Sequence, residues 1–270
     1  MAWEIARPSR ASALHGVDMA GFRIHGDGPA QLRAIPHPAV TVVVEFGDRC
    51  FDVRDSEGRS HSGSLALGLG SSPSPVRVEA IECVQVRLSP TTASAILGFP
   101  HAELSGKLVG LEDIWGRDAL RLRERLHESR SWPERFARVD TMLSARLRED
   151  HRVDPEIAWA WHQITLSRGR LRVEHLAARV GWSRQRLWSR FTAQIGLTPK
   201  RAAMLVRFDH AVHRLVLGHP PAQVAADSGY ADQSHLYRDV RDFTGTPLTS
   251  ATGEPWLAVD DRAWPSSTKR

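Results

Sequence analysis

The fold of the C-terminal part of the chain is decided by two similar stretches, VEHLAARVGWSRQRLWSRFTAQIGLTP (173–199) and PAQVAADSGYADQSHLYRDVRDFTGTP (221–247). Gly181 in the first corresponds to Gly229 in the second, at a point where a left-handed turn residue would end one helix. A capping residue and a second helical segment follow in each. This order predicts a helix-turn-helix, and its repetition makes the prediction specific, because a single helical hairpin is common.

Residues around the two glycines have matching physical roles. Ala177 and Ala225 are small where two helices of each unit are expected to cross closely. Ser183 and Asp232 are good N-caps for the second helix. The second helices are expected to bury Leu187, Phe191, Leu236 and Val240, and to end at Gly196 and Gly245.

The stretch between the two units, TPKRAAMLVRFDHAVHRLVLG (198–218), begins with a cap and a proline and ends at a glycine. A helix over 199–217 would be about 28 Å long. One turn of B-DNA is about 34 Å, the usual spacing of paired half-sites. One rigid helix is therefore expected to place the two units in successive major grooves. Because the helix is somewhat shorter than one turn of DNA, either the duplex is bent or one unit is less fully engaged.

Tandem helix-turn-helix units joined by a long helix resemble the C-terminal domain of AraC/XylS-type transcription regulators. The segment VAADSGYADQSHLYRDVRDFTGTPL (224–248) is similar to the signature of that family, and the resemblance extends over residues 154–253. Val240 departs from it, since the family usually has Phe there. The resemblance implies a sequence-specific transcription regulator. We expect double-stranded DNA and RNA polymerase as partners.

The N-terminal half of the second helix in each unit is expected to face the bases. The residues that this geometry leaves outward are Arg184, Gln185, Trp188, Ser189, Gln233, Ser234, His235 and Arg238. By resemblance, the base-contacting positions of the family fall on all of these except Arg184. Gln pairs with adenine, Arg with guanine, and Trp contacts a thymine methyl. The alternative for any one of these residues is that it only lies on a solvent-exposed helix face and contacts no base. Arg190, Lys200 and Arg201 are expected to contact phosphates.

Residues from about 30 to 88 are predicted to be β-structure. Valine is abundant from Val40 to Phe46, and apolar residues alternate with small or polar ones over 65–69 and 84–88. Turn signals between these runs favour a small barrel or sandwich. Helices are then expected over 118–129 and 134–150, after SPTTASAILG (89–98). The helix over 134–150 either packs on the β-structure or forms a dimer contact.

The predicted fold class is therefore α+β. Residues 1–153 form a β-rich sensor or dimerisation domain, similar in strand pattern to the cupin-like barrels often attached to AraC-type domains. Residues 154–253 form the all-α tandem helix-turn-helix domain, and 254–270, with Trp256 and Trp264, form a loosely packed tail. A small β-barrel can enclose one ligand. Phe46, Phe51 and Trp115 are candidates for lining it and are equally good core residues.

Three functions stay open from these residues. The first is a ligand-responsive regulator with an unidentified small-molecule effector. The second is a constitutive DNA-binding protein whose N-terminal domain only forms a homodimer. The third, disfavoured because no clustered His pattern or nucleophile motif is present, is a cupin-type enzyme fused to a DNA-binding module. We therefore expect no enzyme activity and no cofactor. Asp209, His210 and His213 lie one helical turn apart but lack further metal ligands at fitting spacing, so we expect no metal site.

Composition agrees with a soluble globular protein. The 270 residues are 41% hydrophobic and 25% charged, with a net charge of +5. Residues 154–253 hold 13 basic against 8 acidic side chains, whereas the rest of the chain holds 23 of each. The whole positive excess therefore falls on the predicted DNA-binding domain. The longest strongly apolar run is 39–44, and Cys50 and Cys83 lie in strand-like surroundings. We expect a cytoplasmic protein with reduced cysteines and no membrane partner.

Overall fold

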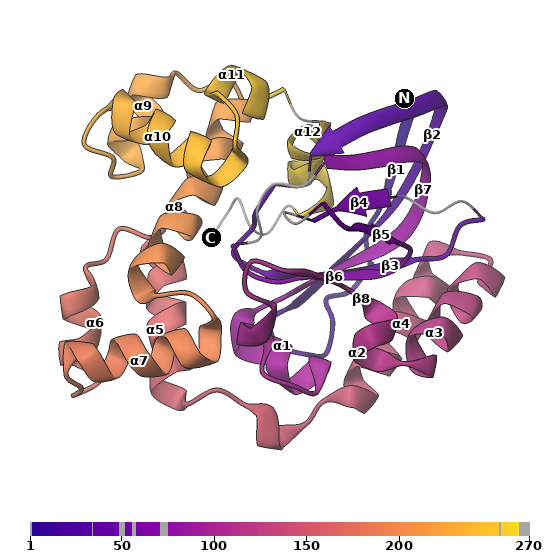
Figure 1. Ribbon diagram of the computed structural model, residues 1–270, viewed down its shortest axis with the longest axis horizontal. Helices are drawn as coiled ribbons and strands as arrows, with labels where there is room; N and C mark the ends of the chain where they lie inside the picture. The colour runs from indigo at the N-terminus through magenta and orange to yellow at the C-terminus, as the bar shows by residue number, and fades with distance from the viewer. Residues whose placement is uncertain are drawn as a thin grey trace.

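The computed structural model describes residues 2–33, 35–48, 52–55, 58–70, 75–253 and 255–264. An antiparallel sheet with helices along one side occupies the N-terminal part, and two helical groups lie at the opposite side of the molecule (Figure 1). Among the described helices, none is long and apolar enough to cross a membrane. The chain is thus a mixed α+β protein with a C-terminal helical region, as the sequence predicts.

Eight strands form one antiparallel sheet. They are β1 (Ala2–Ala6), β2 (Val17–Arg33), β3 (Val40–Glu45), β4 (Asp52–Arg54), β5 (Ser60–Ser62), β6 (Leu65–Leu67), β7 (Pro75–Leu88) and β8 (Leu108–Gly110). Pairing follows the order β1-β2-β7-β3-β6-β8, and β4 joins β5 to β7. Over the described residues this path has two ends, so the expected closed barrel is not observed in this part of the chain.

At the centre of the sheet, the apolar residues that alternate along β3 and β7 are buried opposite each other. Val42 of β3 lies opposite Val86 of β7, and both side chains are fully buried. Val40 and Leu88 form a second buried pair in the same register. Because side chains alternate between the two faces of a strand, this register places these valines and the leucine in the core.

The helices beside the sheet include the three that the sequence predicts, together with three short ones that it does not predict. They are α1 (Pro90–Leu97), η1 (His101–Leu104), α2 (Leu111–Trp115), α3 (Arg117–Glu128), α4 (Trp132–Arg146) and η2 (Glu149–His151). The predicted helix over 134–150 therefore stops at Arg146. Its apolar face, with Phe136, Val139 and Leu143, is buried within the chain. This favours the packed helix over the dimer helix.

The C-terminal region is entirely helical. Its helices are α5 (Pro155–Leu166), α6 (Val173–Arg179), α7 (Arg184–Ile195), α8 (Pro199–Val216), α9 (Pro221–Asp227), α10 (Gln233–Thr244) and α11 (Leu248–Ala251). α8 runs between the group of α5, α6 and α7 and the group of α9, α10 and α11 (Figure 1). One hydrophobic cluster includes Leu104 beside the sheet and Phe191 of α7, so the two regions pack together. The boundary at residue 153 stays a prediction.

The two turns have the predicted chemistry. Gly181 has a φ of 67° and Gly229 a φ of 76°, the left-handed region that glycine adopts at little cost. The Ser183 hydroxyl accepts a hydrogen bond from the backbone N–H of Arg186, which caps α7. Each predicted unit is therefore a helix, a left-handed turn and a capped second helix.

Asp232 caps α10, and its removal is expected to destabilise the second unit. Its Oδ1 accepts a hydrogen bond of 2.7 Å from the backbone N–H of His235. Asp232→Ala should lower the free energy of unfolding by about 1 kcal/mol, because an N-terminal donor of the helix loses its acceptor. Urea denaturation measures this. Asp242→Ala, at an exposed position of the same helix, is the control. Equal effects of the two substitutions would contradict the capping role.

The expectation of a loosely packed tail is wrong for residues 255–264. Pro255–Ala263 forms α12, which lies against the sheet (Figure 1). Leu257, Asp260 and Trp264 are buried, and the Trp264 ring lies 6.4 Å from that of Phe22. These three residues follow an i, i+3, i+7 spacing, which places them along one helix face. Because the middle residue of this face is an aspartate, the sequence does not show the apolar periodicity that is typical of a buried helix.

Candidate nucleic-acid interface

The first predicted reading helix, α7, has one buried and one exposed face. Leu187 and Phe191 are fully buried against the rest of the unit. The four predicted base-reading residues of this helix are all exposed: Arg184, Gln185, Trp188 and Ser189. The Trp188 side chain is 53% exposed, which is unusual for an indole. This face is therefore available to a partner.

The second reading helix, α10, repeats the arrangement with one difference. Leu236 and Val240 are fully buried, and Gln233, Ser234 and Arg238 are exposed. The fourth predicted residue, His235, is only 33% exposed, because its ring packs edge-on against Tyr230 at 5.2 Å. We therefore expect His235 to shape the unit more than to reach a base.

Sequence reasoning missed one exposed aromatic residue on α10. Tyr237 is 42% exposed and directly follows the buried Leu236, as Trp188 follows Leu187 in the first unit. The correspondence between Leu187 and Leu236 is visible in the repeat, and it would have identified Tyr237 as the counterpart of Trp188. Both predicted reading helices thus present an aromatic ring at the same position.

The three predicted phosphate contacts have different surroundings. Lys200 is exposed at the first turn of α8. The Arg201 guanidinium lies 4.0 Å from the ring centroid of Phe243. Arg190 donates to Asp154 at 2.6 Å. Burial acts to raise the pKa of Asp154, but the hydrogen bond from Arg190 keeps it below its ordinary value. Arg190 therefore also ties α7 to the start of α5.

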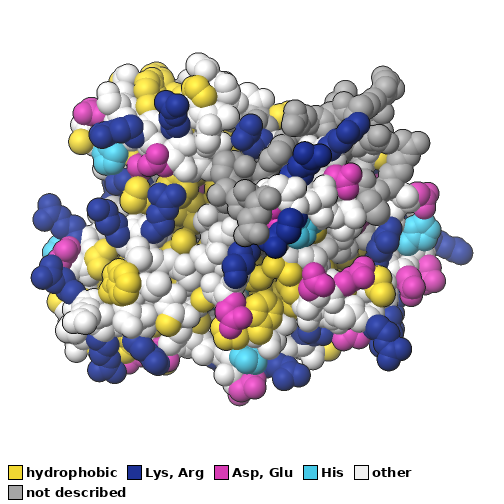
Figure 2. All heavy atoms as spheres, in the orientation of Figure 1, with side chains coloured by type: hydrophobic (Ala, Val, Ile, Leu, Met, Phe, Trp, Pro, Cys, Tyr) yellow, Lys and Arg dark blue, Asp and Glu magenta, His cyan; other side chains and the backbone are white. Residues whose placement is uncertain are grey.

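Helices of both units pack against α8. α8 has 18 residues, one fewer than predicted, and is about 27 Å long at 1.5 Å per residue. Phe208 of α8 stacks on Phe243 of α10 with ring centroids 4.8 Å apart, and Arg207 donates to Asp239 at 2.9 Å. Lys and Arg side chains are spread over the helical region on the face shown in Figure 2.

A family model described as a helix-turn-helix domain matches residues 176–251, which contain both units. The C-terminal domain belongs to the AraC family. Residues 176–251 are accordingly an AraC-type DNA-binding domain. No curated protein sequence matches the chain significantly.

Solved structures with a similar fold include ToxT from Vibrio cholerae. The 1.65 Å structure of ToxT is 12% identical, covers 88% of this chain and 98% of ToxT, and has a TM-score of 0.51. An apo ToxT variant is 10% identical, covers 90% and 98%, and has a TM-score of 0.51. ToxT bound to (E)-4-(8-methylnaphthalen-1-yl)but-3-enoic acid is 12% identical, covers 88% and 98%, and has a TM-score of 0.50. At these identities the likeness shows a shared fold.

Charged residues are buried where α8 of the AraC-type domain meets the sheet and α12. Arg87 of β7 donates to Asp260 of α12 at 2.6 Å and to His37 Nε2 at 2.9 Å. His37 donates through Nδ1 to Asp209 of α8 at 2.8 Å. His37 Nε2 accepts the hydrogen bond from Arg87. We call Arg87, His37, Asp209, His213 and Asp260 the interdomain charge cluster.

His213 completes this cluster as a cation. Its Nδ1 lies 2.6 Å from the backbone carbonyl of Asp209 and its Nε2 lies 2.7 Å from Asp260 Oδ2. Both partners are acceptors, so both ring nitrogens carry a proton. Burial acts to lower the pKa of His213, but the carboxylates of Asp209 and Asp260 raise it to about 9. Two positive charges, on Arg87 and His213, thus face two negative charges.

His213 should make stability depend on alkaline pH. Its folded pKa, about 9, lies above the ordinary value of 6.5, so its stabilisation is complete below pH 6.5 and is lost as the pH rises through 9. The expected loss is about 3 kcal/mol. Denaturant titrations between about pH 7 and 10 measure it. His213→Gln should give a flatter profile, and identical slopes in the two proteins would contradict the assignment.

The metal interpretation of the histidines on α8 finds no support in this geometry. His213 is buried within the interdomain charge cluster, where Asp260 and the backbone carbonyl of Asp209 occupy its two ring nitrogens. Within the described part of the chain, no three His, Cys, Asp or Glu side chains are placed to hold a metal ion.

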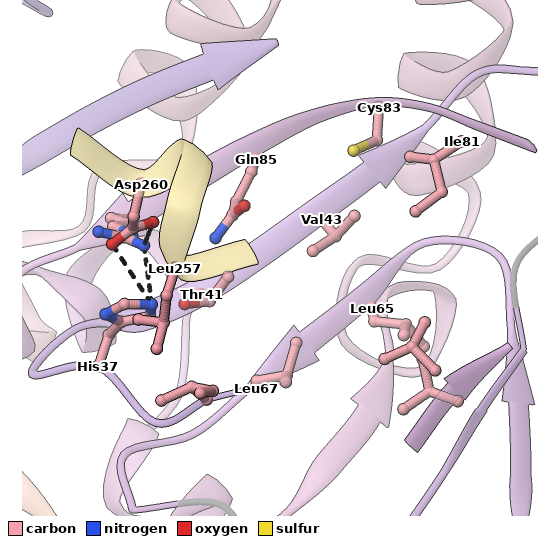
Figure 3. Close-up of a pocket in the computed structure, with 14 residues that line it drawn as sticks. His37, Thr41, Val43, Leu65, Leu67, Ile81, Cys83, Gln85, Leu257 and Asp260 are labelled. Carbon is pink, nitrogen blue, oxygen red and sulfur yellow. Dashed lines mark hydrogen bonds and ion pairs between the residues drawn. The ribbon is translucent and has the colours of Figure 1, made fainter. Parts of the chain in front are cut away.

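A cavity of about 100 Å³ lies between the sheet and α12. The two ends of the cavity differ in polarity. Figure 3 shows His37, Gln85 and Asp260 at one end and Leu65, Ile81 and Cys83 toward the other. Sequence reasoning missed these residues, because they come from separate strands and from α12. Of the lining residues it proposed, Phe46 and Trp115 are buried in the core, and Phe51 lies outside the described residues.

Proposed function

We propose that this regulator reads two successive major grooves, with α7 in one and α10 in the next. The observation that carries the proposal is the repeated exposed face at the two ends of α8, with Gln185 and Trp188 in one unit and Gln233 and Tyr237 in the other. Glutamine pairs bidentately with adenine, and an aromatic ring contacts a thymine methyl. Two such faces on one rigid helix suit two half-sites on one side of a duplex.

We also propose that the N-terminal region is a cupin-like sensor for a small, largely apolar effector. The cavity between the sheet and α12 supports this, because most of its lining is apolar and its polar groups lie at one end. The ToxT fold, which this chain shares, binds a naphthalenyl butenoic acid in one structure. An interior cavity favours the ligand-responsive regulator over the constitutive alternative. A second copy of the chain and RNA polymerase stay predicted partners.

Selection of bound sequences from a random duplex library tests the proposed reading. We expect two conserved blocks with centres about 10 base pairs apart, one for each reading helix. A single conserved block would overturn the proposal that both helices read DNA. Repeating the selection with Arg238→Ala should change preference in one block only, and a change in both would argue against independent half-sites.

A further inference from the structure

The cavity is closed on one side by α12. Leu257 and Asp260 of this helix line it together with residues of the sheet. The present volume of about 100 Å³ equals the share of liquid volume of only a few water molecules, at about 30 Å³ each. Pockets for small ligands usually measure about 300–1,000 Å³. An effector of ordinary size therefore needs a larger cavity than this one, and displacement of α12 would enlarge it.

The polar end of the cavity is built to hold a carboxylate. Arg87 and protonated His213 both bind the Asp260 carboxylate, at 2.6 and 2.7 Å. The Arg87 side chain is 10% exposed, and within the described residues its Nε donates no hydrogen bond. A guanidinium beside an imidazolium is a strong receptor for an acid. In this structure, the acid comes from α12 of the same chain.

We propose that Arg87, His37 and His213 form a carboxylate-binding subsite, and that Asp260 is an internal occupant which an acidic effector displaces. The inference rests on the proposed function of the cavity and names the chemical class of its effector as a carboxylate with an apolar body. The exchange keeps the charge balance of the cluster, because one carboxylate replaces another. The apolar body then lies among the aliphatic side chains of the sheet.

Displacement of Asp260 would act directly on the DNA-binding domain. Asp260 joins α12 to His213 of α8, and Arg87 joins the same carboxylate to β7. Arg87 also lies 4.3 Å from the ring centroid of Trp264, just beyond the end of α12. When an effector acid takes the place of Asp260, the sheet and α8 stay bound to the acid, whereas α12 loses its polar anchor.

The test compares hexanoate with hexanamide, which has nearly the same shape but no charge. Binding to the full-length wild-type protein and to Asp260→Asn is measured by calorimetry. Amide hydrogen exchange of residues 255–264 is followed in parallel. Because Asp260→Asn removes the competing carboxylate, we expect it to bind hexanoate about tenfold more tightly than wild type does. In wild type, hexanoate should speed exchange in α12, and hexanamide should not.

Arg87→Lys is the second variant, since it keeps the buried charge but loses the planar fork. It should bind hexanoate more weakly than wild type while its circular dichroism spectrum is unchanged. Equal binding of hexanoate and hexanamide would overturn the carboxylate subsite and leave the apolar effector cavity standing. Unchanged hexanoate affinity in Asp260→Asn would overturn the displacement. If neither compound bound either protein, this inference would be overturned and the proposed effector cavity would lose support. The proposal that α7 and α10 read DNA would not be affected.

Discussion

Asp260→Ala is expected to lower the free energy of unfolding by about 3–5 kcal/mol, the usual cost of removing one partner from a buried ion pair. The side chain is almost fully buried and neutralises two cations, Arg87 and His213. Burial acts to raise the pKa of Asp260, but Arg87 and the neighbouring histidines hold it far below its ordinary value. Without this carboxylate, the cluster keeps two buried positive charges against Asp209 alone.

Denaturant unfolding at neutral pH measures this loss. Asp227→Ala is the matched control, because Asp227 pairs with Arg214 at 2.8 Å but is 47% exposed. Removal of such a surface pair should cost less than about 1 kcal/mol. If Asp260→Ala and Asp227→Ala had the same small effect, α12 would not be anchored through the interdomain charge cluster.

The double substitution of Gln185 and Gln233 by alanine should cost about 2–6 kcal/mol of specific DNA binding. Each glutamine is exposed on its own reading helix, and each lost base contact is expected to cost about 1–3 kcal/mol. The two positions lie on separate units, so their effects should add nearly completely. Each single variant should relax base preference within one half-site and leave the other unchanged.

Lys200→Ala is the control for this prediction. Lys200 is exposed at the start of α8, where it is expected to contact a phosphate. Its removal should weaken binding to all sequences alike and make the salt dependence shallower. Titrations with the selected operator and with unrelated DNA separate the two effects. If the glutamine variants also lowered affinity for both duplexes equally, direct base reading by α7 and α10 would be refuted.

The tandem helix-turn-helix could be predicted in detail, because its rules are local. Gly181 and Gly229 have the left-handed φ that their place in the repeat demands, and the Ser183 and Asp232 caps each lie within three residues of the donors they accept from. Leu187 identifies the buried face of α7, and the helical period then places the predicted base-reading residues on the exposed face. Only His235 differs, since its packing against Tyr230 depends on a ring outside the helix.

The cavity and the charge cluster could not be predicted, because their parts meet only in the tertiary structure. His37 comes from the loop before β3, and Arg87, His213 and Asp260 come from three separate strands and helices. None of the four stands in a recognisable motif. The pairing of Arg190 with Asp154 is also a contact between distant helices. The burial of α12 was not predicted, because it depends on ion pairs of Asp260 with Arg87 and His213, which are distant in the sequence.

Insertion of base pairs between the two half-sites of a selected operator tests the central claim most directly. α8 is a helix of about 27 Å that fixes both reading helices in one chain. An insertion of roughly 5 base pairs should reduce binding to the level of one half-site, and one of roughly 10, a full turn, should not restore it, because α8 cannot lengthen by the added 34 Å. Recovery of full affinity with the full-turn insertion would contradict the account, since the two half-sites would then be read by units that a rigid helix does not join.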